Sequence, residues 1–321
     1  RMAAGGGWRR ACGGWLVGMA MLTASHAAAQ AHGIAGNRLF PGTLAFDDPA
    51  VMDEWAFAVT ALKHPAEGAD VTDRETGWAF TRLLTSKVAV GVESGWMHRN
   101  WGVAQRSGFD TTALTIKGLL YTNETHELMI AAGLAWGIGH SGAQGVGANA
   151  PHTFTPSITF GKGFGDAPDS LAWLRPFAVT GAVALEHPMS ATSTNLGVDE
   201  ATGQLGPMLT RNVDTLRWGF SLQYSTYYLT GRYTPGKLPK EEPLRQLIPL
   251  VEFAFDTRRG EKTAATMNPG LAYVGDAWQL SAEAIVPLNS EGGRSVGVRG
   301  LLLLFPDDLF PALFGKPMIG R

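Results

Sequence analysis

The stretch Thr215–Ser225 constrains the fold more than any other part of the chain. Large apolar side chains alternate there with small or polar ones, and the apolar set is Leu216, Trp218, Phe220, Leu222 and Tyr224. A period of two places the two sets on opposite faces of a β-strand. About eleven residues is long for a soluble strand, and it is the length that a tilted strand needs to cross a bilayer. The stretch therefore predicts a membrane-spanning strand, provided that the pattern recurs often enough to close a barrel.

The same alternation recurs throughout the chain. The expected strands are 54–63, 77–83, 88–96, 111–121, 128–138, 153–160, 175–187, 215–225, 246–255, 263–273, 278–287 and 294–305. Longer loops alternate with shorter turns between them, apart from the link 226–244, as in bacterial barrels with an even number of strands. We therefore predict an all-β fold, an antiparallel transmembrane β-barrel of about 12 strands. A soluble β-sandwich or propeller is the alternative.

The composition is consistent with such a barrel. Charged residues make up 17 % of the chain, below the usual quarter of a soluble protein. The 41 glycines and 10 tryptophans fit a barrel with aromatic girdles. No apolar stretch long enough for a membrane helix follows the N-terminal region.

The N-terminal region has the pattern of an export signal. Arg9 and Arg10 precede the short apolar run Trp15–Thr23, and small residues follow it. We expect residues 1–31 to be a cleaved signal peptide. Its removal takes away the single cysteine, Cys12, and leaves 23 basic against 28 acidic residues. That balance argues against nucleic acid as a partner.

The rest of the chain divides into three parts. Residues 32–53 are rich in turn formers, and we expect an ordered periplasmic lead-in or a segment that enters the barrel. Residues 54–305 form the barrel, with polar loops at 66–75 and 188–212. Residues 306–321 are a C-terminal tail, in which Leu309–Phe314 is expected to be a small amphipathic helix.

Polar residues that alternate with the apolar ones must face the lumen, because ionisable side chains are costly against lipid. The candidates that line the lumen are Glu93, Lys117, Glu186, Arg217, Gln223, Glu252, Gln279, Glu283 and Arg299. They either form a polar pore that selects small solutes or pair into a network that fills a narrow barrel. Acids and bases occur in similar numbers, which leaves both readings open.

Three other motifs have weaker support. The run Gly161–Gly165 looks like a phosphate-binding loop, but no helix follows, so a turn at a strand end is favoured. Gly139–Gly142 is similar to a nucleophile elbow and raises Ser141 with a loop histidine as a hydrolase alternative. Cleavage after Ala31 exposes His32, whose amine and imidazole are potential copper ligands, although a simple processed end is favoured. No cofactor, metal site or catalytic residue is predicted.

Several segments resemble a family of uncharacterised proteobacterial outer-membrane barrels, related to the MetA-pathway phenol-degradation and transporter-like proteins. The segments that carry the resemblance are 32–33, 40–45, 47–49, 160–166, 174–178, 218–225, 247–253 and 268–270. The resemblance spans nearly all of the expected mature chain and implies a barrel with a transport role. The chain departs from the usual ending, because Ile319-Gly320-Arg321 stands where many barrels end in an aromatic residue, and Phe305 is the expected substitute.

The resulting hypothesis is a non-enzymatic channel or uptake protein of the bacterial outer membrane. Its partners are membrane lipid, the barrel assembly machinery and a small solute, which the resemblance implies to be apolar or aromatic. The alternatives are a barrel hydrolase that uses Ser141 and a closed structural barrel. Neither the solute nor the state of the lumen, open or plugged, follows from the sequence.

Overall fold

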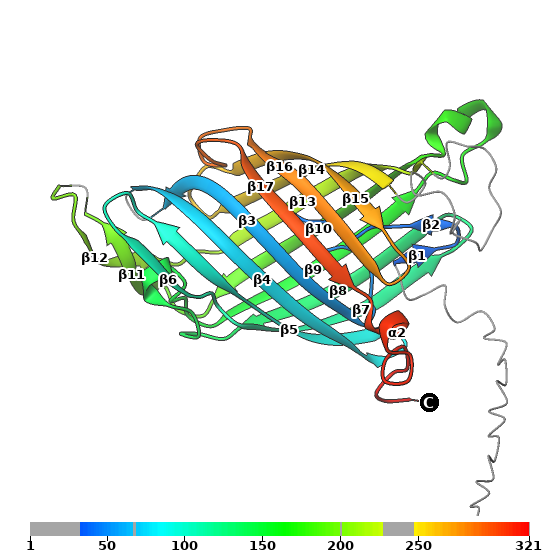
Figure 1. Cartoon of the computed structure of the whole chain (residues 1–321), viewed down its shortest axis with the longest axis horizontal. Helices are drawn as coiled ribbons and strands as arrows, with labels where there is room; N and C mark the ends of the chain where they lie inside the picture. The colour runs from blue at the N-terminus through cyan, green and yellow to red at the C-terminus, as the bar shows by residue number, and fades with distance from the viewer. Residues whose placement is uncertain (1–32, 67–68, 200, 227–246, 321) are drawn as a thin grey trace, which may run out of the picture.

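The computed structural model describes residues 33–66, 69–199, 201–226 and 247–320. Twelve antiparallel strands form a closed barrel (Figure 1). In order around the ring they are β3 (Glu54–Ala66), β4 (Ala69–Thr85), β5 (Val88–Asn100), β7 (Ala113–Asn123), β8 (Leu128–Gly137), β9 (Thr153–Gly163), β10 (Phe177–Pro188), β13 (Thr215–Tyr224), β14 (Leu247–Arg258), β15 (Ala264–Val274), β16 (Trp278–Pro287) and β17 (Gly297–Leu304). The predicted barrel of about 12 strands is confirmed.

The ring closes between the last strand and the first. β17 pairs with β3 over seven residue pairs, from Val298 with Ala61 to Leu304 with Trp55. Every strand of the ring therefore has two antiparallel neighbours, and no backbone edge is left open to lipid.

Some segments differ from the sequence prediction where the strands rise beyond the membrane. The predicted loop 66–75 is wrong, because β4 begins at Ala69 and pairs with β3 along its whole outer half. Charged residues on both faces hide the alternation there. Two further strand pairings lie within predicted loops. β6 (Gln105–Phe109) pairs antiparallel with the outer end of β5, and β11 (Thr192–Val198) pairs with β12 (Leu205–Arg211). The C-terminal helix, α2, spans Pro306–Leu309 rather than Leu309–Phe314.

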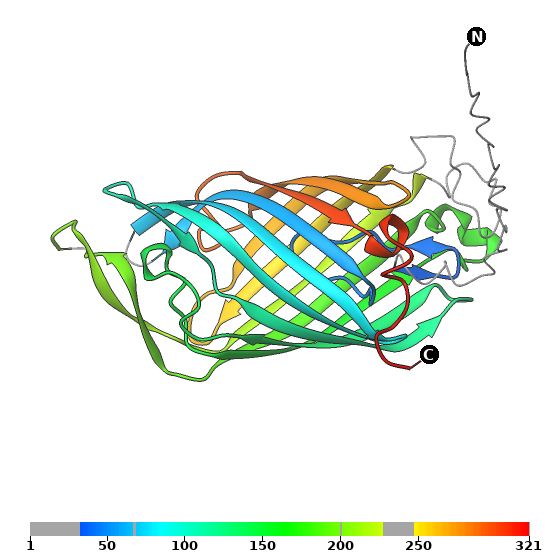
Figure 2. The same cartoon turned by 60° about the horizontal axis from the view of Figure 1, so that its bottom comes forward.

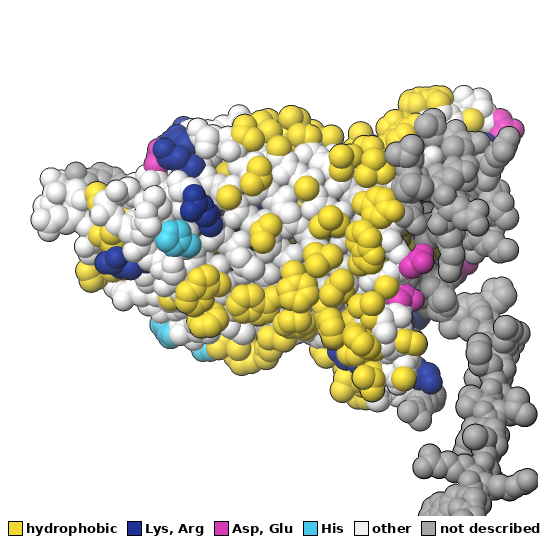
Figure 3. Space-filling view, viewed as in Figure 1, with side chains coloured by type: hydrophobic (Ala, Val, Ile, Leu, Met, Phe, Trp, Pro, Cys, Tyr) yellow, Lys and Arg dark blue, Asp and Glu magenta, His cyan; other side chains and the backbone are white. Residues whose placement is uncertain are grey.

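The outer surface of the barrel is apolar between two aromatic belts. Outward-facing residues such as Val59, Ile116 and Ile158 are exposed, and hydrophobic side chains cover much of the barrel wall in Figure 3. Near one end, Trp136 stacks on Phe154 and Trp218 on Phe255; near the other, Phe177 contacts Tyr224 and Tyr273 contacts Trp278. A closed barrel with this surface is an outer-membrane protein.

The two ends of the barrel carry different connections. Tight turns join β4 to β5 and β15 to β16 at the end where α2 lies. The β11–β12 hairpin extends from the other end of the barrel (Figure 2). Val198 of this hairpin packs against Val71 of β4 and against Trp101, which follows β5. We take the end with short turns as periplasmic, because outer-membrane barrels have short periplasmic turns and longer outer loops.

Residues 33–53, which we call the inner segment, lie inside the barrel. The short strands β1 (Ile34–Ala35) and β2 (Arg38–Leu39) form a hairpin at the periplasmic end. The chain then runs through the lumen and turns back to start β3 at Glu54. Of the two expected arrangements, the structure thus has the one in which the segment enters the barrel. The expected signal peptide, residues 1–31, and most of the link 226–244 lie outside the described residues.

No helix in the described ranges is long and apolar enough to span a membrane.

Candidate functional site in the barrel lumen

All nine lumen candidates lie on the face of their strands that is opposite the large apolar side chains. The register shows this directly: Glu186 lies opposite Thr215, next to the pair of Ala184 with Arg217, and Glu283 lies opposite Arg299. Their surroundings, however, differ from one side of the barrel to the other. The lumen therefore consists of two regions with different surroundings.

The first region, the filled arc, consists of the inner faces of β13–β17. Six of the nine candidates lie on these strands, and four of the six are almost fully buried: Gln223 (2 % exposed), Glu252 (0 %), Gln279 (1 %) and Glu283 (5 %). The inner segment contacts Glu252 and Gln279. Gln223 donates a hydrogen bond to Thr180, and Glu283 accepts one from Arg299, both on neighbouring strands. The side chains that look like a pore lining in the sequence are thus in contact with protein.

Side chains of the filled arc satisfy the backbone of the inner segment. The amide of Gln279 accepts a hydrogen bond from Gly42 N at 3.0 Å and donates one to Gly42 O at 2.9 Å. The carboxylate of Glu252 accepts from Leu44 N at 3.1 Å and from Ala45 N at 2.7 Å. Buried backbone groups that lack a strand partner need such acceptors and donors. These contacts hold the inner segment against one side of the barrel.

Two glycines of the wall make room for aromatic rings of the inner segment. A Cβ at Gly161 would lie 3.1 Å from ring carbons of Phe40, and a Cβ at Gly219 would lie 2.7 Å from the ring of Phe46. Only glycine permits these close approaches. The Gly161–Gly165 run therefore serves packing at the end of β9, consistent with the strand-end interpretation rather than with a phosphate loop.

A buried arginine anchors the start of the inner segment at the periplasmic end. Arg38 is 1 % exposed; its Nε lies 3.2 Å from Glu127 Oε2, and its Nη2 donates to Arg175 O at 2.6 Å. Glu127 also accepts from Gly165 N at 2.9 Å. The inner segment is thereby tied to two periplasmic connections, the turn after β7 and the loop after β9.

The second region, the open arc, consists of the inner faces of β4, β5 and β7–β10. Small residues dominate it, among them Ala79, Ala89, Gly133, Ala135, Ser157 and Ala184. They leave a cavity of about 260 Å³ between this wall and the inner segment. Glu93 faces inward yet is exposed, so solvent reaches the middle of the lumen on this side.

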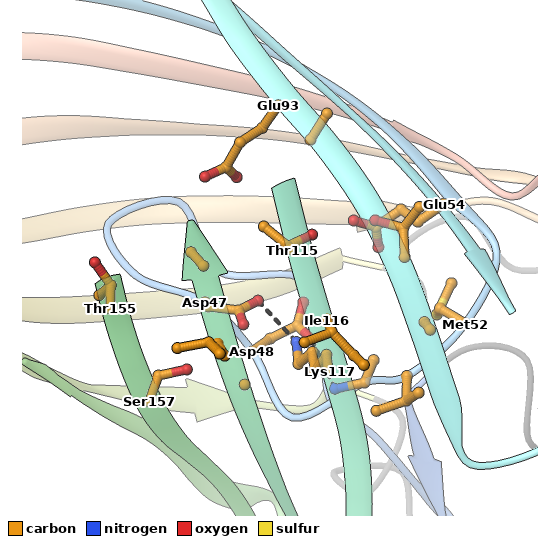
Figure 4. A pocket seen from close by; sticks show the side chains of 18 of the residues that line it. Asp47, Asp48, Met52, Glu54, Glu93, Thr115, Ile116, Lys117, Thr155 and Ser157 are labelled. Carbon is orange, nitrogen blue, oxygen red and sulfur yellow. Dashed lines mark hydrogen bonds and ion pairs between the residues drawn. The ribbon is translucent and has the colours of Figure 1, made fainter. Parts of the chain in front are cut away.

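Charged side chains from three strands and the inner segment meet around this cavity (Figure 4). Lys117 of β7 lies 2.8 Å from Asp47 and 3.8 Å from Asp48 of the inner segment. Glu54 and Glu93 contribute two more carboxylates to the lining. Sequence reasoning identified Glu93 and Lys117 but missed Asp47, Asp48 and Glu54. The two aspartates lie in a stretch without periodicity, and Glu54 is the first residue of its strand.

Two of the remaining candidates, Glu186 and Arg217, lie at the outer mouth, whereas Arg299 pairs with Glu283 at 2.6 Å. Arg217 lies 3.0 Å from Glu186 and 3.8 Å from Asp256, and its side chain is half exposed. These residues line a small depression of about 170 Å³ beneath the outer loops. Nearby, between β6 and β7, burial raises the pKa of Asp110, against a hydrogen bond from Thr111 N that lowers it. The mouth therefore carries charges of both signs, and solvent reaches the Arg217 side chain.

Ser141 lacks the surroundings of a nucleophile. Its Oγ donates to Ile138 O at 2.6 Å and accepts from Thr112 N at 2.9 Å. Within the described residues, no hydrogen bond joins it to a histidine: His140 is bonded to Asn149, and His152 accepts from Gly139 N. An activated serine needs a base within hydrogen-bond reach. The hydroxyl instead stabilises the start of the loop after β8.

Among the described residues, no group of three or more His, Cys, Asp and Glu side chains is placed to hold a metal ion. His32, the potential copper ligand, lies outside the described residues.

Comparison with known proteins yields similarity of fold alone. No protein-family model matches the chain, and no curated protein matches it in sequence. The COG4313 outer membrane channel from Pseudomonas putida F1 is 11 % identical, with a TM-score of 0.49 over 83 % of this chain and 99 % of that one. The KdgM porin is 9 % identical, with a TM-score of 0.45 over 78 % of this chain and 98 % of that one. The NanC porin covers the same shares at 9 % identity and a TM-score of 0.40.

Proposed function

We propose that this protein is a passive channel of the bacterial outer membrane, in which small solutes pass between the inner segment and the open arc. The observation that carries the proposal is the cavity of about 260 Å³ beside the inner segment, lined by small side chains and reached by solvent at Glu93. Side chains of narrow barrels usually fill the interior. Here one side is filled and the other is left open.

The solute is small and is not modified during passage. Thr115, Thr155 and Ser157 supply hydroxyls to the lining, and Ala135 and Ala184 supply apolar surface, so the wall accepts hydrated molecules with apolar parts. An apolar or aromatic solute follows from the family resemblance alone. Membrane lipid surrounds the barrel, and insertion by the barrel assembly machinery belongs to the same proposal.

A closed structural barrel is the second candidate. The hydrogen bonds from Gln279 and Glu252 to the inner segment favour it, because they fix that segment in the lumen. A Ser141 hydrolase has no comparable support, since its hydroxyl is engaged by Ile138 and Thr112. The two remaining candidates differ in one measurable property, which is whether ions cross the purified barrel.

Conductance in planar bilayers tests the proposal with a pair of adjacent substitutions. Ala184 lines the cavity, and Val183 is exposed on the outer wall of the same strand. We expect ohmic current from the wild-type barrel, a severalfold smaller current from Ala184→Trp, and an unchanged current from Val183→Trp. A wild-type barrel that is folded by heat-modifiable gel migration and carries no current would establish the closed structural barrel.

A further inference from the structure

The basic side chains on the inner faces of the barrel strands are already neutralised. On the twelve strands of the ring, within the described part of the chain, each one lies within 4 Å of a carboxylate: Lys117 with Asp47 (2.8 Å), Arg99 with Asp73 (2.6 Å), Arg217 with Glu186 (3.0 Å), Arg258 with Glu261 (3.2 Å) and Arg299 with Glu283 (2.6 Å). Outside the ring, Arg106 of β6 lies opposite Arg99 and is exposed. None of the paired cations on the ring is left over to attract an anion into the lumen.

Carboxylates on the same surface outnumber these bases. Glu54, Glu75 and Glu93 face inward and take part in no ion pair among the described residues. In Figure 4 the side chains of Glu54 and Glu93 lie around the same cavity as Asp47 and Asp48. Lys117 is shared between two aspartates, so a second negative charge remains at that point as well. In the filled arc, by contrast, the carboxylate of Glu252 is buried against backbone N–H groups of the inner segment and does not face the cavity.

The surplus carboxylates follow one another along the lumen. Asp110, between β6 and β7 near the outer mouth, interacts electrostatically with both Glu75 and Glu93. Asp47 in turn interacts with both Glu93 and Glu54, the first residue of β3. Asp47, Glu75, Glu93 and Asp110 therefore form one carboxylate-rich part of the lumen on the side of the open arc.

Low-dielectric walls concentrate such a field, and rings of Asp and Glu side chains select cations in channels. Building on the proposed channel, we infer that the lumen passes small positively charged solutes, inorganic or organic, in preference to anions. Glu93 is the side chain that sets this preference, because it borders the cavity, is exposed to solvent and takes part in no ion pair among the described residues. Glu54 contributes less, because Lys117 attracts its carboxylate. The half-buried Glu75 contributes from the adjacent strand.

The reversal potential across a planar bilayer with a KCl gradient tests the inference. We expect the wild-type barrel to favour K⁺ over Cl⁻. A unit charge about 4 Å from a passing ion in water changes its local concentration about fivefold, so Glu93→Gln is expected to lower the permeability ratio by up to about fivefold. Glu54→Gln with Glu93→Gln should lower it further, and Glu93→Lys should shift it toward anions. Uptake of a small organic amine into proteoliposomes should fall in the same order.

Asp169→Asn is the matched control, because that carboxylate is almost fully exposed in the loop after β9. It should leave the permeability ratio unchanged. A wild-type current without cation preference, or a ratio that the Glu54 and Glu93 substitutions leave unchanged in folded barrels, would overturn the inference and keep the channel. Absence of any wild-type current would instead overturn the channel, and this inference with it.

Discussion

The filled arc and the open arc belong to one barrel wall, and both show the same alternation of apolar and polar residues. Glu252 on β14 and Glu93 on β5 occupy equivalent places in that pattern. Glu252 is fully buried and accepts hydrogen bonds from the inner segment, whereas Glu93 is exposed in the lumen. Facing the lumen is thus a property of the strand, but facing solvent depends on what else the lumen contains.

The difference follows from side-chain size as well as from coverage. Large polar residues on β13–β17 bind the backbone of the inner segment, while Gly133, Ser157 and Ala184 on β8–β10 line the cavity beside it. At the periplasmic end the inner segment also packs on β8–β10, where Phe40 packs with Met129 and Ala178. The filled arc thus holds the inner segment in place, and the open arc leaves space beside it.

The largest expected effect contrasts the two glutamates in stability. Glu252→Ala leaves Leu44 N and Ala45 N buried without their acceptor, and an unmade hydrogen bond of this kind costs about 1–3 kcal/mol. Glu93→Ala removes an exposed side chain and should change the free energy of unfolding by less than about 0.5 kcal/mol. Urea unfolding of the detergent-solubilised barrel, followed by tryptophan fluorescence, measures both.

Glu252→Gln serves as the graded control, because its remaining oxygen still accepts one of the bonds. We expect its free energy of unfolding to lie between those of wild type and Glu252→Ala. Equal losses for Glu252→Ala and Glu93→Ala would show that the two arcs do not differ as the structure indicates.

The barrel was predictable from the sequence because its signal is local. Residues two apart report which face of a strand they share, and stretches such as Thr215–Tyr224 and Trp278–Pro287 carry that signal almost without interruption. The same signal placed all nine polar candidates on the inner face. It failed at 66–75, where the strands leave the membrane and both faces become polar.

The path of the inner segment was not predictable, because the contacts that fix it are distant and carried by backbone. The hydrogen bonds between Gly42 and Gln279 join residues 237 positions apart, and they use the amide and carbonyl that every residue but proline has. Gly161 looked like a strand-end turn, and nothing near it in the sequence points to Phe40. The division of the lumen into two arcs therefore became visible only in three dimensions.

A second effect, of similar size, is expected from filling one of the glycine spaces. Gly161→Val places extra methyl groups against the ring of Phe40, and overpacking of this kind costs about 1–3 kcal/mol. Gly206→Val is the matched control, because nothing lies within 4 Å of a Cβ there. Combining Gly161→Val with Phe40→Ala should recover part of the loss. Urea unfolding of wild type, Gly161→Val, Phe40→Ala and the double variant gives the coupling energy between the two positions. Additive losses would mean that Phe40 does not occupy this space.

The smallest effect concerns the ion pair between the inner segment and the open arc. The Asp47 side chain is 57 % exposed, so its pair with Lys117 resembles a surface salt bridge, which contributes about 0–1 kcal/mol. Lys117→Met should therefore change the free energy of unfolding by less than about 1 kcal/mol, similar to Lys262→Met in an exposed outer loop. Unlike Lys262→Met, however, it removes the basic group that lines the cavity and should raise the preference for cations in the reversal-potential measurement. A loss of several kcal/mol would place Lys117 with the filled arc, and the boundary between the two arcs would have to move from β13 to the far side of β7.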